Sequence, residues 1–310
     1  MILTLTLNPA IDRSIGVDHL AFEDRAYIQS SSESAGGRGL NSSRVIHSFG
    51  GETLALTIAG GESGVRLTEY LGREGFRSRA VGVGNDIRTN LTITDRRGLT
   101  VNLNERGPEL SGAEVGRIER SVARALDRAK WLLLCGSLPP GVPTSFYAKL
   151  IAVARKKKVR TLLHASGDAL REGIAARPSV VTPNQSEAER LLDRSLLTRV
   201  QCLRAAAEIA SFGPDAVVLS LASRGAMAAF SDGLFEAIPP QVEVVCPIGA
   251  GDALTAAYAW RMSKGRSTVP EALRWGVAAG TASALLPGMD YATLADTGNM
   301  YERIEVRRAE

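Results

Sequence analysis

The chain has 310 residues, of which 45% are hydrophobic and 23% charged, a composition typical of a globular protein with a large core. Its net charge is only +4, its lysines and arginines are dispersed, and aromatic residues make up 5%, so it lacks the clustered basic and aromatic residues of a nucleic-acid-binding protein. No apolar run approaches the roughly 20 residues of a membrane span, so no membrane association is expected. Three cysteines, Cys135, Cys202 and Cys246, lack metal-binding or redox spacing, which indicates a reducing cytoplasm.

The N-terminal third predicts a strand, a small exposed sheet and a glycine-rich turn. Residues 2–7 alternate apolar residues with threonine, and Asn8-Pro9 ends this strand just before Asp12. Residues 13–34 are polar with scattered β-formers, which fits a small exposed sheet better than a helix face. The turn from Gly36 to Asn41 then opens a helix over 42–49.

The next segment predicts a strand over 54–59, a helix over 65–72 and a hairpin. Two short alternating runs within 88–101 are joined by Asp95-Arg96-Arg97-Gly98, a typical hairpin turn. We expect these two strands to join those of residues 13–34 in one lid.

From residue 111 onward, helices and strands alternate regularly. The strands expected there are wholly apolar, and apolar strands between amphipathic helices predict a parallel sheet that is buried on both faces. The expected helices are 115–129, 144–155, 169–176, 186–192 and 200–212, and the expected strands are 131–135, 159–163, 180–182 and 216–221. A hairpin over 226–230 and 234–237 follows, and then a β-type run over 242–245.

The turn from Pro247 to Asp252 is the feature around which the chain is organised. It is expected to connect the 242–245 strand to an alanine-rich helix over 253–262. Two glycines remove side-chain bulk there, and the first N–H groups of the helix have no partner within it, so the turn predicts an anion site. An aspartate in such a turn would repel a phosphate unless it takes a proton from an attacking group, which favours phosphoryl transfer. The alternative is that Asp252 is an ordinary helix cap.

Other candidate residues also follow strands, where ligands collect at the carboxyl edge of a parallel sheet. Each of these motifs alone can be interpreted as purely structural, as a stiff turn, a helix cap or a solvated loop residue. Together they predict one site. They are Asp12, the Gly36 to Asn41 turn, the Gly136 to Gly141 turn with Ser137, the segment from Thr182 to Glu187, Ser220, and Gly249 to Asp252.

The order of these motifs resembles the PfkB or ribokinase-like sugar kinases over nearly the whole chain. Within that family it is similar to the branch of 1-phosphofructokinase, tagatose-6-phosphate kinase and the minor 6-phosphofructokinase. The resemblance implies one kinase domain over 1–310 with the ribokinase-like three-layer α/β/α fold, a mostly parallel central sheet and a small β-sheet lid from about 13–34 and 88–103. It also implies ATP as donor, Mg²⁺, a ketohexose monophosphate as acceptor and a homodimer formed through the lid strands.

The resemblance also implies roles for single residues. Asp252 corresponds to the catalytic base, and the backbone of Gly249, Ala250 and Gly251 to the anion hole. The acceptor would be held by sugar-binding residues and by an arginine that grips its phosphate: Asp12, Gly37, Arg38, Asn41, Ser137 and Arg25, with Arg88 as the phosphate clamp. Asn184 and Glu187 correspond to a pair that organises Mg²⁺ through water, and the nucleotide would lie near Ser220, Ala222, Arg224, Gly225 and Gly280.

Three residues depart from the family pattern. His164 stands where an aspartate is usual, Thr182 where a lysine is usual and Ala222 where a glycine is usual. We expect all three to lie on the nucleotide and metal side, with Arg224 supplying charge that Thr182 lacks. The plain alternative for His164 is a structural hydrogen bond at a strand end.

Two function classes therefore remain. The first is an ATP-dependent sugar-phosphate kinase, which the presence of Asp252 favours. The second is a sugar-phosphate-binding protein of the same fold with weak or lost kinase activity, which only the three departures favour. A dinucleotide-dependent dehydrogenase is disfavoured because the Gly36 to Gly39 turn does not follow an apolar strand directly and has the wrong spacing.

Overall fold

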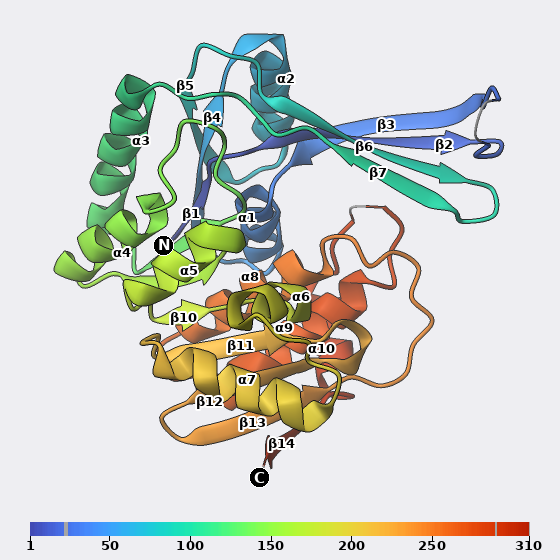
Figure 1. The fold of residues 1–310 in the computed structure, drawn as a ribbon. Helices are drawn as coiled ribbons and strands as arrows, with labels where there is room; N and C mark the ends of the chain where they lie inside the picture. Colours follow the sequence, from blue (N-terminus) through green and yellow to red (C-terminus); the bar gives the residue numbers. More distant parts are fainter. Residues whose placement is uncertain (22–23, 289, 310) are drawn as a thin grey trace.

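The computed structural model describes residues 1–21, 24–288 and 290–309, which form two sheets with helices packed around the larger one (Figure 1). The central sheet has ten strands in the order β14-β13-β12-β11-β10-β9-β8-β1-β4-β5. Neighbouring strands from β11 to β5 run parallel, and β12, β13 and β14 extend the sheet antiparallel. Their bounds are β1 Ile2–Thr6, β4 Thr53–Ala59, β5 Arg77–Gly82, β8 Trp131–Cys135, β9 Arg160–His164, β10 Val180–Val181, β11 Ala216–Ser220, β12 Ala226–Phe230, β13 Gly233–Ile238 and β14 Glu305–Ala309.

The central sheet is buried on both faces because its strands are apolar at consecutive positions. In β8, Leu132 and Leu134 belong to one core cluster, whereas Trp131, Leu133 and Cys135 belong to the other. Since successive side chains of a strand point to opposite faces, the two clusters are the two faces of the sheet.

Helices cover both of these faces. Those that contribute mainly to the first cluster are α2 Gly61–Arg73, α3 Gly112–Ala125, α4 Phe146–Lys156, α5 Gly167–Ala175, α6 Gln185–Leu192 and α7 Arg199–Ser211. Those that contribute to the second are α1 Arg38–Ser48, α8 Ala250–Ser263, α9 Val269–Ser283 and α10 Leu294–Tyr301. The predicted three-layer α/β/α fold is thereby confirmed. Of the helices in the described ranges, none has the length and apolar character needed to traverse a bilayer.

The smaller sheet has four strands in the order β3-β2-β6-β7 and extends away from the helical layers (Figure 1). Its bounds are β2 Ala10–Val17, β3 Ile28–Gly36, β6 Arg88–Asp95 and β7 Thr100–Asn104. These strands fall at the positions expected for the lid, of which residues 22–23 lie outside the described residues. β2 pairs with β6 in parallel over residues 10–17 and 88–95, so the two predicted lid segments join into one sheet through these two strands.

The sequence prediction was wrong in one connection that bears on the site. Residues 242–245 form no strand, and α8 therefore follows a loop rather than a strand. Pro239 and Pro240 stop β13 because proline has no N–H to donate to a neighbouring strand. Val244 and Val245 are 43% and 61% exposed, so the apolar run there marks no core strand.

Several described elements were not predicted, among them two edge strands and the helix α10. β5 and β14 lie at the two edges of the central sheet, and α10 packs against α9. Both edge strands carry arginines on largely exposed positions, which hides the apolar signal of a strand. In addition, α1 begins at Arg38, so the glycine-rich turn is itself the first turn of that helix.

Gly39 sets the distance between α1 and β1. A Cβ atom at this position would lie 2.5 Å from Thr6 Oγ1 and 2.9 Å from the carbonyl oxygen of Leu5. Gly39→Ala should therefore destabilise the protein by roughly 1–2 kcal/mol, since overpacking outweighs the gain in helix propensity. Gly72 also lies in a helix but has no atom within 4 Å of such a Cβ, so Gly72→Ala should be neutral or stabilising. Thermal denaturation of both variants checks this, and an equal effect of the two changes would contradict it.

Candidate functional site

The candidate site lies where the carboxyl ends of the parallel strands, the small sheet and the start of α8 meet. Ser137 and His164 lie at the ends of β8 and β9, and Thr182 directly follows β10. Asn184 and Ser220, after β10 and at the end of β11, are joined by an isolated parallel bridge. The fold thus brings together the candidates that the sequence placed after separate strands.

Asp252 has one hydrogen-bond partner on each carboxylate oxygen in this site. Its exposed fraction is only 8%. Asn41 Nδ2 of α1 donates to Oδ2 at 2.8 Å, and His164 Nε2 of β9 lies 3.2 Å from Oδ1. A buried carboxylate needs such partners to remain charged, and two donors from different elements also fix its orientation.

The Asn41 amide is oriented by a charged group behind it. Arg44 Nη1 donates to Asn41 Oδ1 at 3.2 Å, and Arg44 Nε donates to Glu74 at 2.8 Å. Because Arg44 can only donate, the Asn41 oxygen must face it and the Asn41 N–H₂ group must face Asp252. Asn41, expected to bind sugar hydroxyls, therefore also positions the candidate base.

His164 contacts Asp252 and Thr182 contacts His164, so these two departures lie beside the candidate base, and their expected place on the nucleotide side stays a prediction. Nδ1 of His164 lies 2.9 Å from Thr182 Oγ1 and 3.0 Å from the main-chain oxygen of Thr182. Thr255 of α8 donates in turn to Thr182 Oγ1 at 3.3 Å. The histidine does form hydrogen bonds at a strand end, but one of its partners is Asp252.

The first turn of α8 has the geometry of an anion site. Gly249 is the residue before the helix, in the left-handed conformation with φ 80° and ψ −11°, and no side chain caps the helix. Within the described part of the chain, the N–H groups of Gly249, Gly251 and Asp252 have no hydrogen-bond partner, whereas that of Ala250 lies 3.3 Å from the Pro247 oxygen. Unpaired N–H groups at a helix start attract an anion.

Tyr291 closes this turn from one side. A Cβ atom at Gly249 would lie 2.6 Å from Tyr291 Oη, so only glycine leaves room for the tyrosine. Burial, and then the charge of Asp252, holds the pKa of Tyr291 well above its ordinary value. Its buried hydroxyl has no partner among the described residues. The tyrosine therefore offers a neutral O–H donor beside the anion site.

The small sheet turns one polar face toward this site. Residues paired in register share a face, and β2 pairs Asp12 with Asn90 of β6, which pairs with Asn104 of β7. Asn90 Nδ2 donates to Asp12 Oδ1 at 2.8 Å. A Cβ atom at Gly36 would lie 1.9 Å from Asp12 Oδ2, so the glycine of β3 makes room for this carboxylate.

Arg88 lies on the same polar face and is held by main-chain oxygens. Its Nη2 donates to the oxygen of Asn8 at 3.1 Å and its Nη1 to that of Glu105 at 3.2 Å. Its buried Nε has no partner among the described residues. Burial lowers the pKa of Arg88, and the charges of Asp12 and Glu105 oppose this. Asn8 links the arginine to Ser137, because its Nδ2 donates to Ser137 Oγ at 3.1 Å.

Asn184 and Glu187 form a helix cap in this structure. The Asn184 side chain accepts from the Glu187 N–H at 2.8 Å, and Glu187 Oε2 accepts from the Asn184 N–H at 3.0 Å, a capping box. The other Glu187 oxygen accepts from Arg38 Nη2 at 2.9 Å. Although burial opposes its charge, the carboxylates of Glu187 and Asp252 raise the pKa of Arg38 above its ordinary value. Arg38 thus joins α1 to the start of α6.

The remaining predicted site residues lie in different local environments. Ala222 has a left-handed backbone with φ 53°, and the exposed Arg224 bonds to Gln185. A Cβ atom at Gly280 would lie 2.9 Å from the Ala250 oxygen, so this glycine lets α9 pack against the start of α8. Arg25 is exposed, and its side chain makes no hydrogen bond or ion pair with the described residues.

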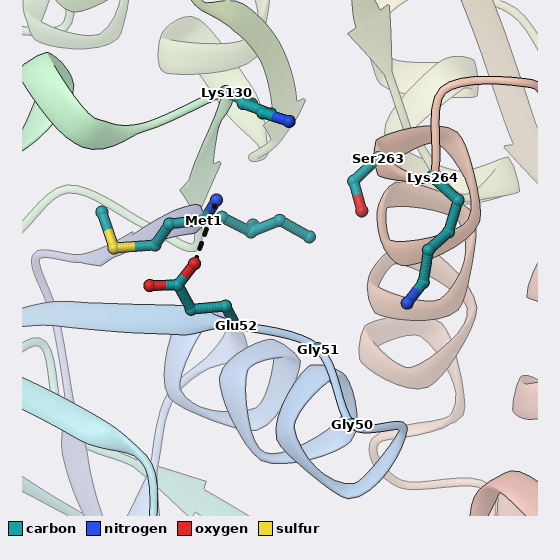
Figure 2. Close-up of a pocket in the computed structure, with 8 residues that line it drawn as sticks. Met1, Gly50, Gly51, Glu52, Lys130, Ser263 and Lys264 are labelled. Carbon is teal, nitrogen blue, oxygen red and sulfur yellow. Dashed lines mark ion pairs between the residues drawn. The ribbon is translucent and has the colours of Figure 1, made fainter.

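A separate pocket lies at the opposite end of the central sheet (Figure 2). Met1 and Glu52 at the starts of β1 and β4 line it together with Lys130 and Lys264, and the Met1 amino group pairs with Glu52 at 3.6 Å. The whole of α8 separates this pocket from Asp252. It contains none of the candidate site residues.

The comparisons with known proteins agree with this geometry. Residues 5–295 match the pfkB family of carbohydrate kinases. This chain belongs to that family. A tagatose-6-phosphate kinase of Staphylococcus epidermidis is 29% identical over 262 residues, which are 84% of this chain and 84% of that protein. The resemblance drawn from the motifs is therefore confirmed.

Two solved structures extend the comparison for this pfkB family kinase. Phosphofructokinase-2 of Escherichia coli is 30% identical, with a TM-score of 0.91 over 97% of this chain and 98% of that one. A possible 1-phosphofructokinase of Thermotoga maritima has a TM-score of 0.92 over 100% of both chains, but at 24% identity it supports the fold alone.

Several residues of the kinase site were not found from the sequence. Asn90, Arg44 and Tyr291 contact candidate residues and Glu74 contacts Arg44, but none of the four was among the predicted site residues. Only Asn90 carried a signal, because it is two residues from Arg88 and two-residue spacing puts both on one face of a strand.

The raised pKa of Asp12 makes the stability of the protein depend on pH in a way that can be tested. Burial raises this pKa, and the Asn90 hydrogen bond and the Arg88 charge offset the shift only partly. The folded state then holds the Asp12 proton more tightly, so the stability from Asp12 is greatest below its ordinary pKa of 3.8 and is lost as pH rises through the folded pKa. Asp12→Asn should therefore raise Tm at neutral pH, and this gain should disappear below the ordinary pKa.

Asp86 is a control because its pKa is shifted in the opposite direction, below its ordinary value. Hydrogen bonds from Ser63 lower the pKa of Asp86, so its contribution is present above the ordinary value and is lost as pH falls through the folded pKa. Asp86→Asn should lower Tm at neutral pH. Thermal melts of both variants across the acid range measure the two signs, and a lower Tm for Asp12→Asn at neutral pH would contradict the assignment.

Proposed function

We propose that this pfkB family carbohydrate kinase transfers the γ-phosphate of ATP to a hydroxyl of a ketohexose monophosphate. The acceptors that we consider are fructose 1-phosphate, tagatose 6-phosphate and fructose 6-phosphate. The observation that carries the proposal is Asp252, a buried carboxylate in the first turn of α8, next to N–H groups that have no partner in the described residues. A base beside an anion hole is the arrangement that phosphoryl transfer to a hydroxyl requires.

In this mechanism the chain contributes position and charge rather than covalent chemistry. Asp252 accepts the proton of the acceptor hydroxyl as that oxygen approaches the γ-phosphorus. The N–H groups of Gly249, Ala250 and Gly251 stabilise the charge that develops on the transferred phosphoryl oxygens. The Ala250 N–H would exchange its long contact to Pro247, 3.3 Å in this structure, for a phosphoryl oxygen.

The polar face of the small sheet would hold the acceptor. Asp12 and Asn41 offer groups suited to sugar hydroxyls, and Arg88 offers a guanidinium for the phosphate already present on the sugar. The buried Arg88 Nε without a partner in the described residues supports this role, since an anion would satisfy it. The relatives are named a tagatose-6-phosphate kinase and phosphofructokinase-2, and the latter has been solved with fructose-6-phosphate at 30% identity.

ATP and Mg²⁺ would occupy the side of Asn184, Ser220, Ala222, Arg224 and Gly225. In the described ranges no group of three His, Cys, Asp or Glu residues gathers to bind a metal. Both Glu187 oxygens are already hydrogen-bonded, which fits an ion held by water and donor phosphates rather than by direct carboxylate ligation. Mg²⁺ would neutralise phosphate charge, and Glu187 and Asn184 would orient its water shell.

We also propose that two copies associate through the small sheet in the cytoplasm. The sheet face opposite Asp12 carries an apolar strip, and Val101 and Leu103 in this strip are 39% and 52% exposed. Single exposed apolar residues are ordinary, but two on one face of an edge strand support a contact. Phosphofructokinase-2 of Escherichia coli has been solved in a tetrameric inhibited form.

An ADP-release assay with the three ketohexose monophosphates tests the activity, with the unphosphorylated sugars as controls. ADP release with at least one phosphorylated acceptor in the presence of ATP and Mg²⁺ is expected. Asp252→Asn should then lower kcat by about 100-fold or more with little change in acceptor binding, because a general base is lost. Equal kcat in both proteins would reject the base assignment, and no turnover in the native enzyme would favour the sugar-phosphate-binding alternative.

Arg88→Ala tests the phosphate clamp. A charge-assisted hydrogen bond contributes about 1.5–3 kcal/mol, so KM for the phosphorylated acceptor should rise roughly 10-fold to 100-fold while KM for ATP stays nearly constant. Arg13 of β2 is the matched control, because it points to the opposite face of the same sheet and lies 3.7 Å from Glu33. Arg13→Ala should leave both KM values unchanged. An equal effect of the two substitutions would reject the clamp.

A further inference from the structure

We infer that His164 is a positioning residue for Asp252, and that a directed chain of hydrogen bonds from Thr255 through Thr182 keeps its ring in one tautomer. The chain would run Thr255 Oγ1–H to Thr182 Oγ1, Thr182 Oγ1–H to His164 Nδ1, and His164 Nε2–H to Asp252 Oδ1. This inference rests on the proposed function, in which Asp252 is the base.

The four side chains form a continuous buried path from α8 back to α8. The exposed fractions are 1% for Thr255, 4% for Thr182, 6% for His164 and 8% for Asp252. The successive distances are 3.3, 2.9 and 3.2 Å. Thr255 and Asp252 are three residues apart in one helix, so the path leaves α8 at Thr255, crosses two strand ends and returns at Asp252.

The donors and acceptors along this path determine the tautomer. An ionised carboxylate can only accept, so the ring must present an N–H at Nε2. A neutral imidazole then has a lone pair at Nδ1, which needs a donor. The Thr182 hydroxyl lies 2.9 Å away. Its oxygen accepts from Thr255, so its own hydrogen remains to be donated to Nδ1. The hydroxyl hydrogens of Thr255 and Thr182 and the Nε2 hydrogen of His164 are then all donated in the same direction, toward Asp252.

A competing acceptor makes the threonine hydroxyl necessary. The main-chain oxygen of Thr182 also lies 3.0 Å from Nδ1 and can only accept. Without the hydroxyl, Nδ1 faces this oxygen alone, which favours a proton on Nδ1. The neutral ring would then turn an Nε2 lone pair toward the carboxylate, and the contact with Asp252 would become repulsive. Thr182 thus selects the tautomer that holds the base.

The consequence for the reaction is an oriented base. Asn41 and His164 each place one N–H on a different oxygen of Asp252, and they reach it from α1 and β9. With both donors in place, the carboxylate plane is fixed relative to the anion hole on the same helix turn. With the His164 donor lost, the carboxylate can rotate about its last side-chain bond, and fewer of its orientations face the acceptor hydroxyl.

Thr182→Val and Thr182→Ser form the matched pair that tests this. The valine variant keeps the shape but removes the hydroxyl, and the serine variant keeps the hydroxyl. Thr182→Val should lower kcat about 10-fold with both KM values within about 2-fold, since one hydrogen bond made in the reactive arrangement is lost. Thr182→Ser should keep most of kcat. His164→Gln, which carries an amide N–H at the place of Nε2, should retain more activity than His164→Leu.

Nitrogen NMR of the histidine rings supplies a readout that does not depend on activity. The chain has three histidines, so His164→Gln assigns the His164 signals by their loss. At about pH 8, above the ordinary range of imidazole titration, the native His164 ring should carry a proton on Nε2 and none on Nδ1. The ring in Thr182→Val should instead carry a proton on Nδ1.

The outcomes separate this inference from the proposed function. A native ring protonated on Nδ1, or on both nitrogens, overturns the chain even if both Thr182 variants fail to fold. Equal kcat in Thr182→Val and Thr182→Ser, with Asp252→Asn inactive, overturns the positioning role but leaves Asp252 as the base. Full activity of Asp252→Asn rejects the base assignment instead, and no turnover in the native enzyme rejects the proposed function, whatever the ring tautomer is.

Discussion

The burial of the Asp252 carboxylate is the constraint on which the arrangement of the site depends. A charged group with 8% exposure needs hydrogen-bond donors, and the chain supplies them from distant segments. Asn41 is 211 residues away in sequence and His164 is 88 residues away. Both donors are themselves oriented, Asn41 by the Arg44–Glu74 pair and His164 by Thr182. The Asp252 carboxylate, the proposed base, is thus fixed by the packing of α1, β9 and α8 around it.

Close approach of the backbone makes this arrangement possible. Gly39 lets α1 lie directly on β1, Gly36 leaves space for the Asp12 carboxylate, and Gly249 leaves space for Tyr291. At each of these positions a larger side chain would collide with a neighbouring polar group. The turn at Gly249 therefore acts twice, since it exposes N–H groups and also leaves room for Tyr291 beside them.

The sequence could predict the layers and the strand ends because these carry strong local signals. Continuous apolar strands such as 131–135 have to be buried, and glycine turns before helices expose N–H groups. The same reasoning failed where tertiary packing decides. Residues 242–245 are apolar but follow two prolines and find no partner strand, whereas β14 is an edge strand rich in arginine. The contact of Asn90 with Asp12 depends on a register between strands far apart in sequence, which no local pattern encodes.

The structure shows that the residues at positions 164 and 182, which both depart from the family pattern, contact each other. In the family pattern an aspartate and a lysine are usual at these positions, and here His164 and Thr182 lie 2.9 Å apart. Relative to that pattern, an acid and a base are missing together and a contacting histidine and threonine stand in their place, so one negative and one positive group are absent beside Asp252. A lysine alone at position 182 would have brought a positive charge into a buried site without its usual acidic neighbour. Arg224 is exposed and bonded to Gln185, and its role as a compensating charge stays a prediction.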